Sequence, residues 1–427
     1  MSFDTVLPVK HSSHGCSHVR PVTISNSVIF VDDAGDTVYE IEPSLTTETG
    51  LLDSDLTVVA PHLFEGRTIV DMTATRRPRP TIWYVMSDGD MLGMTYLPEQ
   101  AVRAWHRHTT DGLFKACVAV REGDEDRLYV IVERVIDGTT KRFVERMAVR
   151  RFEEIEEAVV LDGCIKLPDY RDPLPFVGSM TKASPVVVST VDANGIAYAH
   201  GLVNADIVDL TGITYLDSDG EVQRHVANNK FKVAAAGATS FSLTYVEDGV
   251  DVDGSDPDTG WAFTPATPMG RVRKCFNAVT ALEYAGHTVN IRANGFHHDA
   301  KTLDANGYTL LDDWYSRIHV GLGYRKRFWS LPIKDARFGG ARVRSAGLEI
   351  SVEDSVGFRF GTTPYNLKPV HNVLPTWWGQ SLKTQTTVWG GRSMFSKWGR
   401  DGGVIIQQDD PQPFRVLAMY PKVEVGE

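Results

Sequence analysis

The amino-acid sequence predicts an all-β protein, built from four-stranded antiparallel units of the β-propeller blade type together with small β-barrel or sandwich domains. Short apolar runs follow one another between residues 68 and 151, separated by turns rich in acids and glycine. Very few stretches show helical periodicity. Residues 82–85 superpose on 128–131 at an offset of about 46 residues, the length expected of a propeller blade.

The repeat predicts two successive blade units. Asp88-Gly89 in the first and Asp137-Gly138 in the second are strong hairpin signals, because such pairs favour the two-residue turns that join antiparallel strands. Strands are expected at 68–74, 81–86, 91–96 and 102–108 in the first unit, and at 113–120, 128–135 and 140–147 in the second.

A partial earlier blade precedes them, with a hairpin of strands at 27–31 and 37–41. Residues 42–61 are expected to form a long connection with a short helical turn at 54–59. A short helix is expected at 150–157.

Composition divides the chain into five parts. These are an N-terminal arm (1–19), the propeller blades (20–158), a linker rich in Pro, Asp and Gly (159–182), an inserted small β domain (183–268) and a C-terminal β region (269–427) that completes the propeller, forms a sandwich, or both. Further strands are expected at 185–189, 206–210, 230–233, 240–245, 281–293, 308–311, 316–320, 341–352 and 416–420.

The totals exclude several classes of protein. A net charge of −11 does not suggest a general nucleic-acid-binding surface. The chain has no window of eighteen apolar residues, so no membrane span is expected, and its first residues do not read as a secretory signal. The scattered cysteines are expected to be free thiols of a protein made in a reducing cytoplasm; they are Cys16, Cys117, Cys164 and Cys275.

Two loops are dense in carboxylates, and both are interpreted as solvated turns. Calcium binding by the second loop is the alternative, because calcium prefers several oxygen ligands, but its glycine is misplaced for an EF-hand. The acids of the first loop are Glu122, Asp124, Glu125 and Asp126, and those of the second are Asp251, Asp253, Asp256 and Asp258.

Histidines gather in three places, where a metal site is the alternative to an ordinary arm, strand or turn. The ordinary interpretation is preferred in each case, so no metal or other cofactor is expected. The groups are His11, His14, Cys16 and His18 in the arm, His106 and His108 on one strand face, and His297, His298 and Asp299 at a hairpin tip.

A basic and aromatic cluster lies at residues 325–329. It suits a phosphate backbone or an acidic partner subunit, and the subunit is preferred because an isolated cluster in an acidic protein is a poor nucleic-acid footprint. Tryptophans nearer the C-terminus supply large apolar area for a core or an interface. The interface candidates are Arg325, Lys326, Arg327, Trp329, Trp377, Trp378, Trp398 and Arg400.

Sequence motifs of catalysis do not appear. The chain contains no phosphate-binding Gly-x-x-x-x-Gly-Lys loop, no dinucleotide fingerprint, no Gly-x-Ser-x-Gly elbow and no His-Glu-x-x-His pair. No pair of acids stands out for sugar chemistry, although such a pair is defined in space rather than in sequence. No catalytic residue is assigned, and the protein is not expected to be an enzyme.

Several stretches, in their order and combination, resemble one known family. They are 27–35, 56–66 with 69–72, 92–96, Glu99-Gln100, 105–112, 144–147, 398–401, 408–411, 416–419 and 421–426. Together they resemble the tail tubular protein B, or nozzle, family of short-tailed bacteriophages. Residues 185–264 look like the small β module, often labelled FCCH-like, that some members contain.

The resemblance implies a structural protein of the virion tail, made in the host cytoplasm. Nozzle proteins form a ring, usually a hexamer, below the portal and adaptor rings, and their channel lets DNA leave. Adaptor, tail fibres and further copies are therefore the expected partners, and DNA passes without being held. The acidic loops are expected to line or flank the channel, since like charge keeps passage fast.

One departure from the family affects these expectations. Members usually carry a long β-rich segment before the position equivalent to Arg20. Either the C-terminal strands complete the propeller, or a separate chain supplies the missing blades. The competing functions are a tail-associated glycan hydrolase, which needs two carboxylates facing a cleft, and a carbohydrate- or receptor-binding β module, which needs exposed tryptophans.

Overall fold

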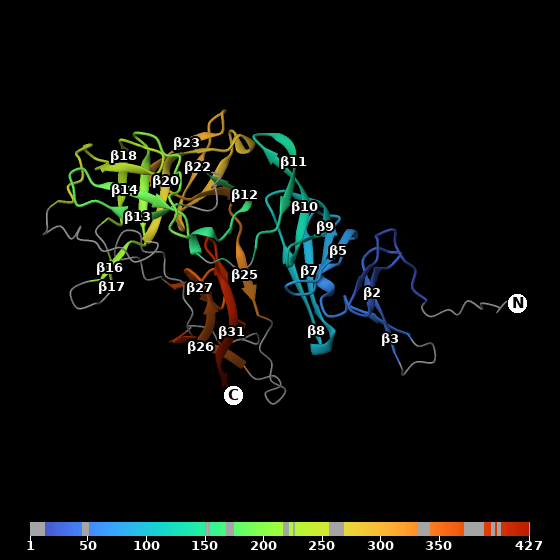
Figure 1. Ribbon diagram of the computed structural model, residues 1–427. Coiled ribbons are helices and arrows are strands. Elements are labelled where there is room, and N and C mark those ends of the chain that lie inside the picture. Colours follow the sequence, from blue (N-terminus) through green and yellow to red (C-terminus); the bar gives the residue numbers. More distant parts are fainter. Residues whose placement is uncertain are drawn as a thin grey trace, which may run out of the picture. The chain divides into compact units, whose positions relative to one another are not determined.

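The computed structural model describes residues 13–44, 51–149, 152, 154–167, 175–216, 222–224, 227–255, 269–330, 342–370, 388–393, 398 and 403–426. The elements of these residues are β-strands and short 3-10 turns, with no α-helix among them, so the predicted all-β class is confirmed (Figure 1). The chain divides into two compact units, Met1–Val149 and Arg150–Glu427.

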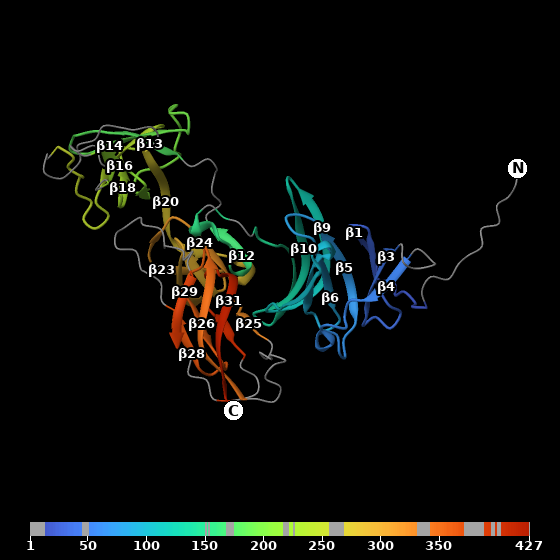
Figure 2. The same cartoon turned by 90° about the horizontal axis from the view of Figure 1, so that it is seen from below.

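The first unit contains three antiparallel sheets in which each strand pairs with the next along the chain (Figure 2). This up-and-down order is that of propeller blades. The first sheet is β1 (Val22–Ile24), β2 (Ser27–Val31), β3 (Val38–Pro43) and β4 (Leu51–Asp55). The second is β5 (Ile69–Thr75), β6 (Thr81–Met86), β7 (Met91–Leu97) and β8 (Val102–His108), and the third is β9 (Leu113–Glu122), β10 (Glu125–Ile136) and β11 (Thr139–Arg146). The 3-10 turns are η1 (Pro61–Leu63) and η2 (Pro98–Gln100).

The predicted hairpin turns are present at both Asp-Gly pairs. Asp137 and Gly138 both have positive φ, of 48° and 72°, between the paired residues Ile136 and Thr139. This is the conformation of a two-residue turn that matches strand twist. Gly89 likewise has a φ of 88° between β6 and β7.

The 46-residue repeat corresponds to successive sheets that lie against each other. Asp71 of β5 accepts a hydrogen bond from the backbone N–H of Cys117 in β9, at 2.8 Å. Thr73 of β5 accepts one from the N–H of Ala119, at 3.1 Å. Both pairs are 46 residues apart, so the offset found in the sequence places equivalent strands side by side.

Two details of the blade region differ from expectation. The hairpin at 27–41 belongs to a full four-stranded sheet, because β1 and β4 flank it. The segment 42–61 is therefore not only a connection, and β4 replaces the start of the helical turn expected at 54–59. The sequence of β4 does not show the alternation of apolar and polar residues that predicts a strand, because the strand has few apolar residues and both Asp53 and Asp55 are exposed.

The second unit contains a small barrel around its own apolar core (Figure 1). Seven strands lie in the order β13-β14-β19-β18-β15-β20-β23, and an additional pairing of β13 with β20 closes the first six. They are β13 (Phe176–Met180), β14 (Val187–Val191), β15 (Ile207–Thr211), β18 (Lys230–Ala234), β19 (Ser240–Thr244), β20 (Met269–Thr280) and β23 (Tyr308–Tyr315). A separate hairpin is β16 (Thr214–Leu216) with β17 (Val222–Arg224).

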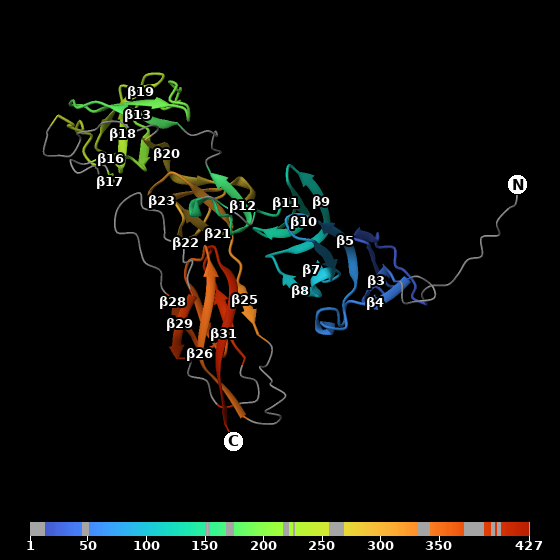
Figure 3. The same cartoon turned by 60° about the horizontal axis from the view of Figure 1, so that its bottom comes forward.

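The rest of the second unit is a four-stranded sheet and a two-sheet sandwich (Figure 3). The four-stranded sheet, called the base sheet here, is β12 (Asp162–Leu167), β24 (Ile318–Leu322), β21 (Thr288–Ala293) and β22 (Phe296–Thr302). The sandwich sheets are β25 (Lys326–Trp329), β30 (Ile405–Gln408), β27 (Phe358–Gly361) and β28 (Leu367–Val370), and β29 (Val388–Ser393), β26 (Arg342–Glu353) and β31 (Arg415–Gly426). The 3-10 turns are η3 (Ile155–Glu157) and η5 (Leu282–Tyr284).

Several predicted boundaries shift in the structure. The range 159–182, expected to be a linker, contains β12 and β13, because each pairs with a strand far along the chain. The inserted domain is wider than 183–268, since β13 and β20 close its barrel. The first unit ends at Val149 rather than at 158, and the expected helix at 150–157 is reduced to η3.

A buried carboxylate joins the first two sheets of the first unit. Glu40 of β3 is fully buried and accepts hydrogen bonds from Ser27 Oγ at 2.8 Å, from Arg103 Nη2 at 2.9 Å and from the hydroxyl of Tyr96. Burial and the bond to Glu40 raise the pKa of Tyr96 to about 12. The donors come from β2, β7 and β8, so one side chain fixes how the two sheets pack.

Replacing this carboxylate should loosen the first unit. We expect Glu40→Gln to lower the free energy of unfolding by about 3 kcal/mol, because Arg103 keeps its charge and loses its buried partner. Hydrogen exchange during urea unfolding, read in peptides from β1 to β8, measures the change. Glu42→Gln on the same strand is the matched control, and equal effects of the two variants would contradict the assigned role.

Candidate functional site

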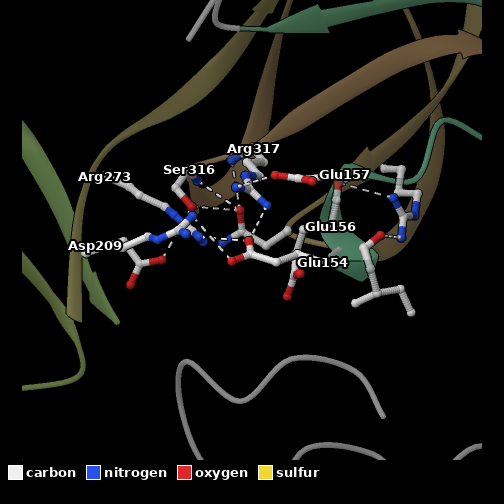
Figure 4. Close-up of polar contacts among 11 residues, drawn as sticks. Glu154, Glu156, Glu157, Asp209, Arg273, Ser316 and Arg317 are labelled. Atoms are coloured by element: carbon white, nitrogen blue, oxygen red, sulfur yellow. Dashed lines mark hydrogen bonds and ion pairs between the residues drawn. The ribbon is translucent and has the colours of Figure 1, made fainter. Parts of the chain in front are cut away.

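A network of charged side chains surrounds Glu154 in the second unit (Figure 4). The Glu154 carboxylate lies 2.7 Å from Arg317 Nη1, 3.0 Å from Arg273 Nη2 and 3.4 Å from Arg271 Nη1. Arg317 also reaches Glu157, at 3.1 Å. One acid thus holds three guanidinium groups, and these five residues are called the Glu154 network below.

Three separate parts of the chain bring the network together. Glu154 and Glu157 lie at η3, which follows the first unit. Arg271 and Arg273 are alternate residues of the barrel strand β20, so their side chains lie on one face of it. Arg317 immediately precedes β24 of the base sheet. The network therefore ties η3, the barrel and the base sheet to one another.

The environment of Glu154 favours its charged form. Burial by itself would raise the pKa of this carboxyl, but the guanidinium groups of Arg273, Arg317 and Arg271 outweigh it and lower the pKa. Arg273 and Arg317 are themselves nearly buried. Buried cations need a charged partner, so the network is held in its ionised state.

Arg292 of β21 secures the other side of η3 and is almost inaccessible to solvent. Its guanidinium donates to the carbonyl oxygens of Ile155 at 2.6 Å and Ala158 at 2.8 Å. Burial lowers the pKa of Arg292 to about 10. The arginine thus gives a second donor to the Ile155 carbonyl, which also accepts from the Ala158 N–H of the turn, and a donor to the Ala158 carbonyl that follows it.

Asn294 and Asp209 extend the network toward the barrel. Asn294 Oδ1 accepts from the backbone N–H groups of Ser316 and Arg317, at 3.0 and 2.9 Å. The Ser316 hydroxyl donates to Asn294 Oδ1 at 3.0 Å and also lies 3.4 Å from Asp209 Oδ2 of β15 (Figure 4). The arrangement fixes position rather than presenting a reactive group, since the contacts join fold elements to one another.

Sequence reasoning missed the Glu154 network. Arg271 and Arg273 stand at alternate positions, a visible sign of a charged strand face, but their partner lies 119 residues from Arg273 and 163 from Arg317. Pairings over such distances leave no local pattern. The segment that carries Glu154 is predicted as a helix, and its apolar residues Phe152, Ile155 and Ala158 do recur at a spacing of three, which is close to helical periodicity.

The basic cluster at 325–329 is divided by the structure. Arg325 pairs with Asp409 at 2.8 Å, and Arg327 donates to Gln407 at 2.8 Å, so both contact the neighbouring strand segment. Lys326 is turned inward, where its Nζ donates to Gln408 Oε1 at 2.9 Å. Lys326 therefore does not belong to an exposed interface patch, whereas Trp329 is 58% exposed.

Of the tryptophan candidates, Trp398 is described and exposed, and the Arg344 guanidinium lies over its ring at 4.9 Å. This cation–π contact belongs to the chain itself. Trp377, Trp378 and Arg400 lie outside the described residues.

The first acidic loop forms the turn between β9 and β10, and most of its charge is paired. Glu122 contacts Arg146 at 2.8 Å and accepts from the Tyr129 hydroxyl. Asp126 accepts from the N–H groups of Arg76 and Arg77, at 2.6 and 3.2 Å. Glu125 lies 2.5 Å from Arg127, and Asp124 is exposed. The turn thus carries less net charge than its sequence suggests.

The second acidic loop is described only up to Ser255. Asp251 is exposed and forms a β-bridge with Thr244. Asp253 accepts from the hydroxyl of Ser255 and from its backbone N–H at 2.9 Å, and these two bonds lower the pKa of Asp253. Asp256 and Asp258 lie outside the described residues.

Several histidines of the three groups pack against aromatic side chains of the chain itself. His106 and His108 share β8 and face each other at 2.7 Å between ring nitrogens, against Trp83. His298 lies on strand β22, not at the expected hairpin tip, and packs against Tyr315. His14 stacks on Tyr39 at 3.9 Å, while His11 lies outside the described residues. No group of three or more potential metal ligands occurs among the described residues.

Within the described part of the chain, no helix has both the length and the apolar character needed to cross a membrane.

Removing the central acid should weaken the junction of η3, barrel and base sheet. We expect Glu154→Gln to lower the free energy of unfolding of the second unit by about 2 kcal/mol, because two nearly buried arginines lose their charged partner. Scanning calorimetry, with hydrogen exchange in β15, β20 and β24, measures this effect. Glu247→Gln, at an exposed barrel position, is the control and should leave the free energy of unfolding unchanged. A decrease equal to that of Glu154→Gln would contradict the role assigned to Glu154.

Lys326 should make stability depend on pH. Burial, with a contribution from Arg292, lowers the pKa of Lys326 to about 7, whereas the pKa of a lysine in an unfolded chain is about 10.4. Between these values the unfolded chain binds more protons at this residue, so the contribution of Lys326 to the free energy of unfolding rises with pH from about 7 to about 10. Lys326→Met should flatten this rise in urea titrations, and the exposed control Lys422→Met should keep it. Parallel pH profiles for wild type and Lys326→Met would refute the assignment.

Comparison with known proteins gives little further information. No protein-family model matches the chain, and no curated protein matches it. A similar solved structure is an exo-β-1,3-galactanase of Phanerochaete chrysosporium with β-1,3-galactotriose, at 11% identity and a TM-score of 0.19, aligned over 95% of this chain and 81% of the galactanase. With so low a TM-score, the likeness bears on neither the fold nor the activity of this chain.

Proposed function

We propose that the protein is a structural component of a bacteriophage tail, a subunit of a nozzle ring beneath the portal and adaptor through which DNA leaves the virion. The observation that carries the proposal is the series of three blade-like sheets, of which the second and third follow each other at a 46-residue spacing. The stretches that resemble the nozzle family fall on β2, β5, β7, β8 and β11 of this series.

The charge balance supports passage of DNA without retention. The chain has a net charge of −11, and like charge repels a phosphate backbone. Because Glu122, Glu125 and Asp126 are paired with arginines or backbone N–H groups, this repulsion depends on the whole chain more than on the β9–β10 turn.

The proposed role is non-catalytic and depends on assembly. Its partners are further copies of the chain in a ring, which in the family is usually a hexamer, the adaptor, and the tail fibres. The polar networks around Glu40 and Glu154 suit such a role, since each fixes the position of packed sheets.

The test is the assembly state of the purified full chain, alone and with the adaptor. We expect native mass spectrometry to give a ring of about six copies, and negative-stain electron microscopy to show a central opening. A chain that stays monomeric with the adaptor, and that cleaves or binds glycans from a panel, would overturn the proposal in favour of the enzyme or binding-module alternatives.

A further inference from the structure

The outer face of the third sheet in the first unit is apolar and exposed. Residues directly opposite each other in antiparallel strands share a face, and the pairings Ile131–Val144, Ile131–Ala116 and Tyr129–Val118 define this one. Val144 is 75% exposed and Val118 52%, while Val120 and Ile131 are also exposed. Contiguous apolar side chains on an exposed sheet face mark an interaction surface.

The inner faces show how such a sheet is normally covered in this unit. Leu128, Val130 and Val132 of β10 pack with Trp83 and Val85 of the second sheet. The second sheet in turn packs its other face on the first sheet. The unit is thus a series of sheets packed face to face, and the third sheet presents a further face of the same kind at the end of the series.

The other end of the series is the outer face of the first sheet. Val28 of β2 lies opposite Ile41 of β3 on this face, and Val28 is exposed. Asp53 and Asp55 of β4 lie opposite Ile41 and Tyr39, and both acids are exposed. His14 stacks on Tyr39 at one side of the face and leaves Val28 accessible.

The two end faces carry complementary charge. The first sheet's outer face carries the carboxylates Asp53 and Asp55, with Asp53 lying 3.6 Å from His14 Nε2. Burial and the nearby Asp55, Asp32, Asp53 and Asp36 raise the pKa of Tyr39 on the same face. On the third sheet the most exposed charges are guanidinium groups: Arg142 is 72% and Arg146 56% exposed at the side chain, while their partners Glu133 and Glu122 are 19% and 31% exposed. An acidic face with an apolar centre therefore matches an apolar face on which guanidinium groups are the more exposed members of their ion pairs.

We infer that the outer face of the third sheet docks on the outer face of the first sheet of a second copy of this chain. Two different faces then meet, so the contact is heterologous and leaves both end faces of the pair open for further copies. Repetition closes a ring where the rotation permits. The inference deepens the proposed function, because it names the contact through which subunits of the ring join.

Two single substitutions block one face each, and both lie at exposed positions. Val144→Asp alters the third sheet and Val28→Asp the first, with Val203→Asp, an exposed barrel position, as the control. Light scattering after size exclusion should show wild type and control as oligomers and each face variant as a monomer, with association weakened at least tenfold. An equimolar mixture of the two variants should give dimers and nothing larger, since one intact pair of faces remains between them.

Each other outcome overturns the inference in a distinct way. Oligomers that persist in both variants would place the ring contact elsewhere and leave the proposed function standing. A wild-type monomer would refute both. Dimers lost only with Val144→Asp would indicate like faces meeting, and a change in stability at constant mass would indicate that the chain covers the face itself.

Hydrogen exchange of the wild type keeps the test informative if a variant fails to fold. Raising the protein concentration across the association range should protect β9 to β11 together with β2 to β4. Protection of only one of these two groups would contradict a contact between different faces.

Discussion

The first unit depends on one constraint: strand β6 of its second sheet is buried on both faces. All six residues of β6 are buried, with Ile82, Tyr84 and Met86 packed toward the first sheet and Trp83 and Val85 toward the third. Alternate residues of a strand point to opposite faces, so a strand with large apolar side chains on both faces must be covered on both. The first and third sheets supply this cover. The series of sheets continues only where another sheet packs on one of their outer faces.

Charged groups within the packed regions have a different role from apolar ones. Apolar contacts tolerate small shifts, but a buried ion without partners is costly. Glu40 and the nearly buried Arg273 and Arg317 that contact Glu154 therefore need their partners at defined positions. Each acid collects donors from separate elements. Such networks select one arrangement of sheets among several that would bury similar area, which suits a protein whose function is to hold a shape.

Much of the fold was predictable because its signals are local. The Asp-Gly turns, the apolar runs and the 46-residue spacing lie within short windows, and strands such as β6 and β15 were located to within one residue. What could not be predicted was non-local. The barrel closure pairs Phe176 with Arg271, and Lys326 looked like a surface cation until its cross-strand neighbour Gln408 was placed beside it. The acidic turn was visible, but the arginines that neutralise it come from strands whose register the sequence does not specify.

The pairing of β13 with β20 has a consequence for how the barrel relates to the rest of the chain. The strand that enters the barrel and the strand that leaves it are antiparallel neighbours, with Phe176 opposite Arg271. Adjacent strands lie about 5 Å apart, so entry and exit almost coincide. A closed module whose chain enters and leaves at neighbouring strands can be inserted without changing the path of the chain on either side. The contacts of Arg271 and Arg273 with Glu154 then fix its position.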